Sequence, residues 1–301
     1  MVRDGRVAVT TDARGRKALT GVGGVSVLPL DTPASAEVFW RRHGTTSEQV
    51  GQVLNACPGL RWLHTDTAGV DDLPLAALAA REVTVTRTTA YAQAVAEWIV
   101  TAVLLAAKGV PAYVRAGDRR EWAPGAGRPR LVAGTRALII GNGAIGSRAR
   151  AMLHSMDVHV RTSSRRAPGG WRRWLPATDW LVLACPLTAE TRGLIDATAL
   201  ASLKPGAWVI NVARGGILDE QALATALGSG ALGGAVLDTF ATEPLPRSSR
   251  LWGREQVLVL PHDTWRARGA GLRQVECFLR LLERYRAGQP LSPVVDPTAG
   301  Y

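Results

Sequence analysis

The chain has 301 residues and is 47% hydrophobic, so it is long enough for two domains with apolar cores and does not belong to the disordered class. Its net charge is +11, carried almost entirely by arginine, because lysine occurs only at positions 17, 108 and 204. A bias of composition explains this excess of arginine best, although the positive charge also suits anionic ligands. The basic runs are short and no nucleic-acid-binding motif accompanies them. We therefore predict no nucleic-acid partner.

Cysteine usage and hydropathy exclude further classes of protein. Cys57, Cys185 and Cys277 are far apart, which argues against a disulfide framework and a zinc site, so we predict no metal and a reducing compartment. The N-terminus lacks the apolar core of a signal peptide, and the longest apolar stretch, residues 95–107, contains Glu97 and is too short to span a bilayer. We therefore predict a cytoplasmic protein without a membrane partner.

The first ninety residues alternate between strand-like and helix-like segments. Residues 47–56 have a helical pattern, and strand-like runs lie at residues 6–10, 25–28, 37–40, 62–65 and 83–86. This alternation predicts an α/β domain. The next predicted helix, residues 92–108, has apolar residues too dense for a surface helix, so we expect it to be a buried connector.

A glycine-rich turn follows the Gly-, Pro- and Arg-rich residues 117–130. An apolar strand ends at Ile140, Gly141, Gly143 and Gly146 come next, and a helix-compatible run follows them. Gly141 permits a tight turn, Gly143 lets the backbone approach a pyrophosphate, and Gly146 lets the helix pack on the strand. Because N–H groups at a helix N-terminus attract anions, we predict a dinucleotide-binding site here.

The next predicted strand, residues 156–160, ends where NAD-binding chains usually carry an acidic residue. This chain instead has Arg161-Thr-Ser-Ser-Arg-Arg166. Cationic and hydroxyl donors that suit a 2′-phosphate are supplied by Arg161, Arg165 and Arg166 with Ser163 and Ser164. We therefore predict NADP(H) as the preferred cofactor and NAD(H) as the second choice; the alternative interpretation is a solvated basic loop.

Four more strands complete this second series, at residues 180–184, 207–212, 234–237 and 257–260. They predict a doubly wound parallel sheet. The connection between residues 166 and 179 is too short and too broken for a full crossover helix, so we expect the adenosine side of the site to be unusually open. A last helix, residues 271–286, comes after this sheet is complete and is free to pack on the first domain.

Three chemically matched side chains follow the later strands. Arg214 lies just past a strand and beside two glycines, where a guanidinium can bind a carboxylate and its neighbouring carbonyl oxygen. His262 can protonate the alkoxide that forms when a ketone accepts hydride, and Glu243 can hold its ring and favour its protonated form. These residues predict reduction of an α-keto acid; the alternatives are a turn arginine and a structural histidine.

Several stretches resemble the D-isomer-specific 2-hydroxyacid dehydrogenases, in particular the glyoxylate/hydroxypyruvate reductases. They are residues 67–71, 94–97, 141–146, 186–191, 211–216, 237–240, 243–246 and 261–262, so the resemblance covers nearly the whole chain. The interval from Arg214 to Glu243, 243 minus 214 or 29 positions, and the 19 positions from Glu243 to His262 both match the family pattern. The expected fold class is α/β with two Rossmann-like doubly wound domains. A cofactor domain, residues 94–268, is inserted in a discontinuous substrate domain, residues 1–93 and 269–301.

The resemblance also implies roles for individual residues. Arg214 would bind and polarise the substrate, Glu243 would tune His262, and His262 would be the acid and base. The backbone N–H groups of Ala68 and Gly69 would receive the substrate carboxylate. Asp238 would meet the nicotinamide carboxamide, while Cys185 and Pro186 would line the adenosine or ribose. The expected cofactor contacts are Gly141, Gly143, Ala144, Ile145, Gly146, Arg161, Thr162, Ser163, Arg165, Cys185, Pro186, Thr191, Val212, Ala213, Asp238 and His262. Because members of the family are usually homodimers, a homodimer is expected.

Two features of the sequence bear on the choice of substrate. Asp263-Thr-Trp265 follows the histidine where the family often has small residues, which predicts a carboxylate and a large ring near the nicotinamide. Alternatively, Trp265 belongs to the core and Asp263 caps the following helix. Arg41 and Arg42 favour a second acidic group on the substrate if they reach the site; otherwise we expect them on the solvated surface.

The predicted function is therefore reduction of a small-molecule α-keto acid to a D-2-hydroxy acid with NADPH. Two alternatives remain at this point. A biosynthetic reductase of a phosphonate or aryl keto acid shares the chemistry and differs only in the pocket. A dinucleotide-sensing regulator of the C-terminal-binding corepressor type keeps the same fold for partner recognition, although no partner motif is present here.

Overall fold

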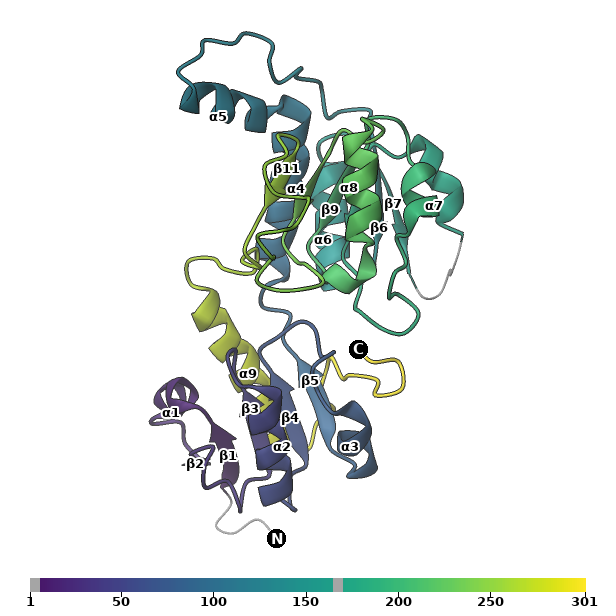
Figure 1. Cartoon of the computed structure of the whole chain (residues 1–301). Coiled ribbons are helices and arrows are strands. Elements are labelled where there is room, and N and C mark those ends of the chain that lie inside the picture. Colours follow the sequence, from purple (N-terminus) through teal and green to yellow (C-terminus); the bar gives the residue numbers. More distant parts are fainter. Residues whose placement is uncertain (1–5, 165–169) are drawn as a thin grey trace. The chain divides into compact units, whose positions relative to one another are not determined.

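The computed structural model describes residues 6–164 and 170–301, which form two compact units (Figure 1). One unit comprises residues 1–91 and 268–301, and the other comprises residues 92–267. We call them the terminal unit and the central unit. Each contains a parallel sheet with helices on both faces, so the predicted fold class is confirmed.

The sheet of the terminal unit has five parallel strands in the order β2-β1-β3-β4-β5. The strands are β1 Val7–Thr11, β2 Val25–Leu28, β3 Val38–Arg41, β4 Trp62–Thr65 and β5 Thr84–Arg87. Its helices are α1 Ala13–Leu19, α2 Ser47–Ala56, α3 Leu75–Ala80 and α9 Ala270–Arg286. The wide separation of α9 from the other helices in sequence makes this unit discontinuous.

Apolar residues on both faces of this sheet are covered by helices. On one face, α2 and α3 bury Val53 and Leu78 against Phe39 and Leu63 of the sheet. On the other face, α1 and α9 pack on the sheet. There Phe278 of α9 stacks on Trp40 of β3, with 4.1 Å between ring centroids. Stacked aromatic rings of this size provide much of the buried apolar area of a core.

The sheet of the central unit has six parallel strands in the order β11-β10-β9-β8-β6-β7. The strands are β6 Arg136–Ile140, β7 His159–Ser163, β8 Trp180–Leu183, β9 Trp208–Asn211, β10 Gly234–Leu237 and β11 Val257–Val259. The helices are α4 Ala92–Lys108, α5 Val110–Asp118, α6 Ala144–His154, α7 Ala197–Ala201 and α8 Glu220–Gly228, with short 3-10 helices at Arg172–Ala177 and Gly215–Ile217.

The predicted burial of the 92–108 helix is confirmed, because α4 packs with α6 on one face of this sheet. α7 and α8 cover the other face. Since every strand is parallel, all six strands end at the same edge of the sheet, where ligands bind in open α/β sheets. Among the described residues, no single helix is long and apolar enough to cross a bilayer; α4 and α5 reach that length only as a pair, and the pair is bent by 69°.

The structure differs from the prediction most clearly at two places. The strand predicted at residues 156–160 begins only at His159, because Asp157 has a left-handed backbone (φ 59°) and Val158 N still donates to Leu153 O at the end of α6. As a result Arg161 and Thr162 lie within β7 instead of following it. Helix α5 was not predicted. In its described part, the connection from β7 to β8 contains only the 3-10 helix at Arg172–Ala177, which leaves β7 as an edge strand.

Candidate active site

The glycine turn after β6 has the backbone geometry that a phosphate cradle requires. Gly141 has φ 116°, and a Cβ there would lie 2.4 Å from Ala184 O. A Cβ on Gly146 would lie 2.1 Å from Gly141 O, so both positions admit only glycine. Gly143, in contrast, has no atom within 4 Å of where its Cβ would be. A Cβ there would therefore project into open space beside the turn. Helix α6 begins directly after it, so the first-turn amides of Ala144, Ile145 and Gly146 lie beside the opening. These residues fit a pyrophosphate.

The predicted 2′-phosphate site lies at the end of β7. Arg161 is exposed, and its guanidinium carbon lies 4.9 Å from the ring centroid of Trp174. Arg173 approaches the same ring at 5.1 Å. Thr162 is half-buried, and Ser163 is buried with its carbonyl accepting from Gly141 N. The predicted donors Arg165 and Arg166 lie outside the described residues. A groove of about 640 Å³ runs beside this strand, and it is lined by Ser147, Arg150, Ala151, His154, His159, Val160 and Arg161.

Trp174 is a candidate site residue that the sequence analysis missed. A guanidinium over an indole ring is attracted to the face of the ring and loses rotational freedom there. The indole thereby orients Arg161. The run Trp171-Arg-Arg-Trp174, which places arginines beside tryptophans, was the available signal.

The predicted contacts after β8 and β9 form short, internally bonded turns. Thr191 Oγ1 donates to Pro186 O at 2.7 Å and accepts from Thr188 N at 2.8 Å, which closes the 186–191 turn. Burial raises the pKa of Cys185 to about 11, so its thiol is neutral at physiological pH and is no nucleophile. After β9, half-buried Val212 and buried Ala213 lead into the loop of Arg214.

Asn211 shapes the Arg214 loop and is a second residue that the sequence analysis missed. It is fully buried; its Oδ1 accepts from Ala213 N at 3.0 Å and its Nδ2 donates to Arg214 O at 3.1 Å. Gly215 then lets this loop touch the next one, because a Cβ there would lie 1.8 Å from the carbonyl carbon of Phe240. Half-buried Arg214 is thus held against the loop that carries Glu243.

Glu243 and His262 are paired directly. Glu243 Oε2 lies 2.8 Å from His262 Nδ1, and Glu243 Oε1 accepts from Phe240 N at 2.9 Å. A carboxylate at Nδ1 favours the tautomer with its proton on Nδ1, or the doubly protonated ring, and leaves Nε2 for a ligand. Both side chains remain accessible, at 39% exposure for His262 and 37% for Glu243. Glu220 supports the same loop, since its Oε1 accepts from Ala241 N at 2.6 Å.

The backbone of His262 is strained and is held from behind. Its φ of 54° is left-handed, which is uncommon for histidine. Trp265 Nε1 donates to His262 O at 3.0 Å. Buried Asp238 accepts from Asp263 N at 2.8 Å and from the backbone and hydroxyl of Thr264. These contacts fix the loop on which the imidazole stands.

The structure contradicts the alternative interpretations of two residues in this loop, Asp263 and Trp265. Asp263 caps no helix, because α9 begins only at Ala270, and it pairs with Arg266 instead. Trp265 is half-buried rather than a core residue. The carboxylate of Asp238 holds the loop, and its implied contact with a carboxamide stays a prediction.

In the terminal unit, the Thr67–Gly69 loop after β4 offers unpaired amides. Ala68 O accepts from Arg87 Nη1 at 3.0 Å, and Gly69 O accepts from Thr67 Oγ1 at 2.7 Å. The N–H groups of Ala68 and Gly69 donate to no other described residue. Both residues are half-buried. Two amides with tied carbonyls and unpaired N–H groups are suited to an anion.

Arg41 and Arg42 are not on the solvated surface, so that alternative is wrong. Arg41 is 4% exposed and forms an ion pair with Asp72. Arg42 lies over the ring of Trp40 at 4.6 Å, with Nε 2.9 Å from Asp66 Oδ2, although its N–H does not point at that oxygen. Both charges are therefore compensated within the unit. Across residues 6–164 and 170–301, no group of three or more His, Cys, Asp or Glu side chains could hold a metal.

Comparison with known proteins supports the same interpretation. Residues 100–263 match the NAD binding domain of the D-isomer specific 2-hydroxyacid dehydrogenases. The chain is 35% identical over 174 residues to a glyoxylate/hydroxypyruvate reductase A of Salmonella typhi, covering 54% of this chain and 55% of that protein. It is 32% identical over 239 residues to a D-3-phosphoglycerate dehydrogenase of Mycobacterium bovis, covering 75% of this chain and 45% of that protein. The chain thus spans about half the length of the curated relatives it matches.

A solved structure matches over nearly the whole chain. It is an NADPH-dependent glyoxylate/hydroxypyruvate reductase from Sinorhizobium meliloti in complex with NADP and sulfate, with a TM-score of 0.83 and 28% identity over 98% of this chain and 100% of that one. Together, the sequence match and the two parallel-sheet units establish that the chain belongs to the D-isomer-specific 2-hydroxyacid dehydrogenase family.

Proposed function

We propose that this protein reduces a small 2-keto acid to the D-2-hydroxy acid, with NADPH as the hydride donor. The observation that carries the proposal is the Glu243–His262 pair, in which an accessible imidazole is held by a carboxylate at 2.8 Å on a strained, well-supported loop. That loop follows a parallel strand of the unit that contains the glycine cradle, at the edge where such sheets bind ligands.

Each step of the reaction has a residue suited to it. The glycine cradle and Arg161 would hold NADPH, which would supply hydride to the carbonyl carbon of the substrate when bound. His262 donates a proton from Nε2 to the carbonyl oxygen as charge develops there, while Glu243 stabilises the imidazolium and keeps Nδ1 toward itself. Arg214 binds the carboxylate and carbonyl oxygens through its planar guanidinium. The N–H groups of Ala68 and Gly69 hold the carboxylate, and in the oxidation direction His262 acts as the base.

The preference for NADPH rests on the residues of β7. Arg161 presents an exposed, ring-oriented guanidinium where an acidic residue would otherwise favour NAD(H), and NAD(H) remains the second choice. The Sinorhizobium meliloti reductase, whose structure contains NADP, supports this choice. The cofactor contacts proposed here are those of the sequence analysis, with Trp174 added as the residue that orients Arg161.

We further propose a homodimer in the cytoplasm. Val114, Trp122 and Leu131 are large apolar side chains exposed on the central unit, at 57%, 95% and 75%, and a second copy would cover them. The three cysteines are unpaired, which fits a reducing compartment.

A turnover assay tests the function. NADPH oxidation is followed with glyoxylate, hydroxypyruvate and the bulkier phenylpyruvate, for the wild type and for His262→Gln. We expect the wild type to reduce at least one of these acids and His262→Gln to lose about 10²- to 10⁴-fold in kcat. His154→Gln, which removes an exposed histidine at the end of α6, is the matched control and is expected to keep kcat. NADPH binding without reduction of any keto acid would refute the proposed activity and favour a regulatory role.

A further inference from the structure

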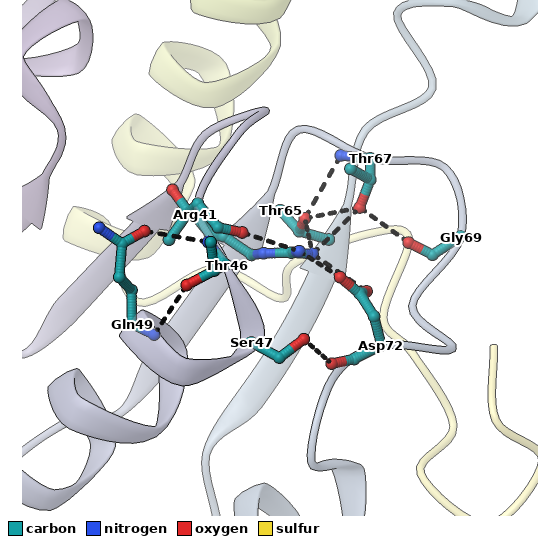
Figure 2. A network of polar contacts seen from close by, with 9 residues as sticks. Arg41, Thr46, Ser47, Gln49, Thr65, Thr67, Gly69 and Asp72 are labelled. Carbon is teal, nitrogen blue, oxygen red and sulfur yellow. Dashed lines mark hydrogen bonds and ion pairs between the residues drawn. The ribbon is translucent and has the colours of Figure 1, made fainter. Parts of the chain in front are cut away.

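The guanidinium of Arg41 lies inside the terminal unit, between two loops that follow neighbouring strands (Figure 2). It forms a two-pronged ion pair with Asp72, with Nη1 3.2 Å from Oδ1 and Nη2 bound to Oδ2. Such paired N–H···O contacts fix orientation as well as adding charge-assisted strength. Although Asp72 is partly exposed, Arg41 is almost completely buried, so its guanidinium faces the protein rather than solvent.

The same guanidinium ties both loops together. Its Nη2 donates to Thr45 O at 3.2 Å, just before α2, and its Nη1 lies 3.3 Å from Thr65 Oγ1 and 3.4 Å from Thr67 Oγ1. Ser47 Oγ, in the first turn of α2, donates to Asp72 O at 3.1 Å. The start of α2 is itself rigid, because Thr46 and Gln49 form a reciprocal capping box. The 66–72 loop is therefore fastened to a fixed helix end.

Thr67 connects the fastened part of the loop to the residues with unpaired amides. Thr67 Oγ1 lies 2.8 Å from Thr65 Oγ1 and donates to Gly69 O at 2.7 Å, which closes the turn. On the other side, Arg87 holds Ala68 O. In a planar trans peptide the C=O of one residue and the N–H of the next point in opposite directions. Holding the Ala68 carbonyl therefore fixes the direction of the Gly69 N–H group.

We propose that Arg41 and Asp72 are positioning residues that preorganise the Ala68 and Gly69 amides for the carboxylate of the substrate. This inference rests on the proposed function and deepens it. Arg41 touches no substrate, because its accessible area is nearly zero and its Nη1 and Nη2 groups already face oxygens of its own unit. The charge of Arg41 therefore selects no second acidic group on the substrate, and its effect is exerted through Thr67 and Asp72.

Steady-state kinetics test the proposal through the split between KM and kcat. In Arg41→Met, we expect KM for the keto acid to rise about tenfold to a hundredfold, which is the order of affinity that hydrogen bonds to a charged carboxylate contribute. Binding shared by ground and transition states changes KM and leaves kcat within about threefold. KM for NADPH should stay within about threefold, because the cradle belongs to the other unit. Arg41→Lys should be milder, since an ammonium keeps the charge and loses the fork.

Matched variants separate positioning from general loss of stability. Arg81 is a half-buried arginine of the same unit, and it donates to Leu54 O and Cys57 O, away from the 66–72 loop. Arg81→Met should lower the melting temperature and leave KM unchanged. Asp72→Asn should raise KM in the same direction as Arg41→Met, and the double variant should be less than additive, because the two residues act through one pair.

Hydrogen–deuterium exchange gives a readout independent of activity. Peptides covering residues 66–73 should exchange faster in Arg41→Met than in the wild type, and those covering residues 141–146 should not. If KM for the keto acid and exchange at residues 66–73 are both unchanged, or if Arg81→Met raises KM equally, the positioning role is wrong. If the wild type reduces no keto acid, the proposed function fails, and the exchange experiment still decides whether Arg41 orders the loop.

Discussion

Polar side chains lie at or just past the ends of parallel strands in both units, but the two units use them in opposite ways. In the central unit, Glu243 and His262 are each more than a third exposed and pair with each other. In the terminal unit, His64 and Asp66 are fully buried, and Arg41 nearly so. A group at the carboxyl edge of a sheet is therefore available for chemistry only where the neighbouring loops leave it accessible.

Burial has visible electrostatic consequences in the terminal unit. It lowers the pKa of His64 to about 3, so that imidazole is neutral at physiological pH and cannot serve as an acid. It also raises the pKa of Asp66 to about 6, against the lowering effects of the Trp40 hydrogen bond and the Arg42 charge. These groups act as scaffold, and the reactive pair lies in the other unit.

The largest effect that would test this comparison is expected for Glu243→Gln. The amide removes the negative charge at His262 Nδ1 while Phe240 N can keep an oxygen acceptor. We expect kcat for keto acid reduction to fall about 10²-fold or more, since the imidazolium loses its counter-charge. The melting temperature should barely change, because both side chains are accessible.

Glu220→Gln is the matched control, because Glu220 accepts from Ala241 N in the same loop and has no contact with His262 among the described residues. We expect it to lower kcat by less than about tenfold. Equal losses in the two variants would show that loop support, rather than the carboxylate at the imidazole, sets the rate.

A smaller effect is expected at β7. Arg161→Ser should lower kcat/KM for NADPH relative to NADH by about tenfold, the size of one charge-assisted hydrogen bond. Trp174→Leu should change this ratio in the same direction and by less, because the indole only orients the guanidinium. The measurement is kcat/KM with each cofactor at saturating keto acid.

Arg172→Ser provides the control for the cofactor experiment. Arg172 also stacks on a tryptophan, with 4.7 Å to the ring of Trp171, but it carries no predicted phosphate contact. In Arg172→Ser, the ratio of kcat/KM for NADPH to that for NADH should equal the ratio in the wild type. An unchanged ratio in Arg161→Ser would remove the proposed basis for the cofactor preference.

The smallest effect concerns how the stability of the terminal unit depends on pH. The pKa of His64 is about 3 in the folded state against 6.5 as its ordinary value, so its contribution is present above pH 6.5 and is lost as pH falls toward 3. The raised pKa of Asp66 acts in the opposite sense: its contribution is present below pH 3.8 and is lost as pH rises through 6. In wild-type protein the two trends oppose each other between pH 4 and 6.

His64→Asn should therefore reveal the trend of Asp66 alone. Between pH 6.5 and 4, we expect the stability of this variant to gain on the wild type by at most about 1.4 kcal/mol per pH unit, the value of one full proton. Urea unfolding at several pH values measures the difference. For the exposed His159→Asn, the free energy of unfolding should depend on pH as it does in the wild type. The same pH dependence in His64→Asn and the wild type would show that the proposed role of His64 is wrong.

Much of the fold and of the candidate site could be predicted from local pattern. Gly141, Gly143 and Gly146 follow an apolar strand, and the left-handed φ of Gly141 and the close approach of Gly146 to Gly141 O are local properties of the backbone. The helix at residues 92–108 was predicted with its observed bounds, because its apolar pattern is long. The strand at residues 234–237 was predicted equally well, because clear breaks flank its apolar pattern. β7 was misplaced, since a left-handed Asp157 is not encoded by hydrophobic periodicity.

What the sequence alone determined was the order of the chemistry along the chain: a glycine cradle, a basic strand end, and then Arg214, Glu243 and His262 after successive strands. These features are local, and the covalent order of the chain fixes them. Only the tertiary structure decided which polar residues remain accessible. Arg41 ends β3 and His262 follows β11, yet packing buries the first and leaves the second partly exposed. Burial is a sum over neighbours from distant parts of the chain, and no local pattern contains that sum.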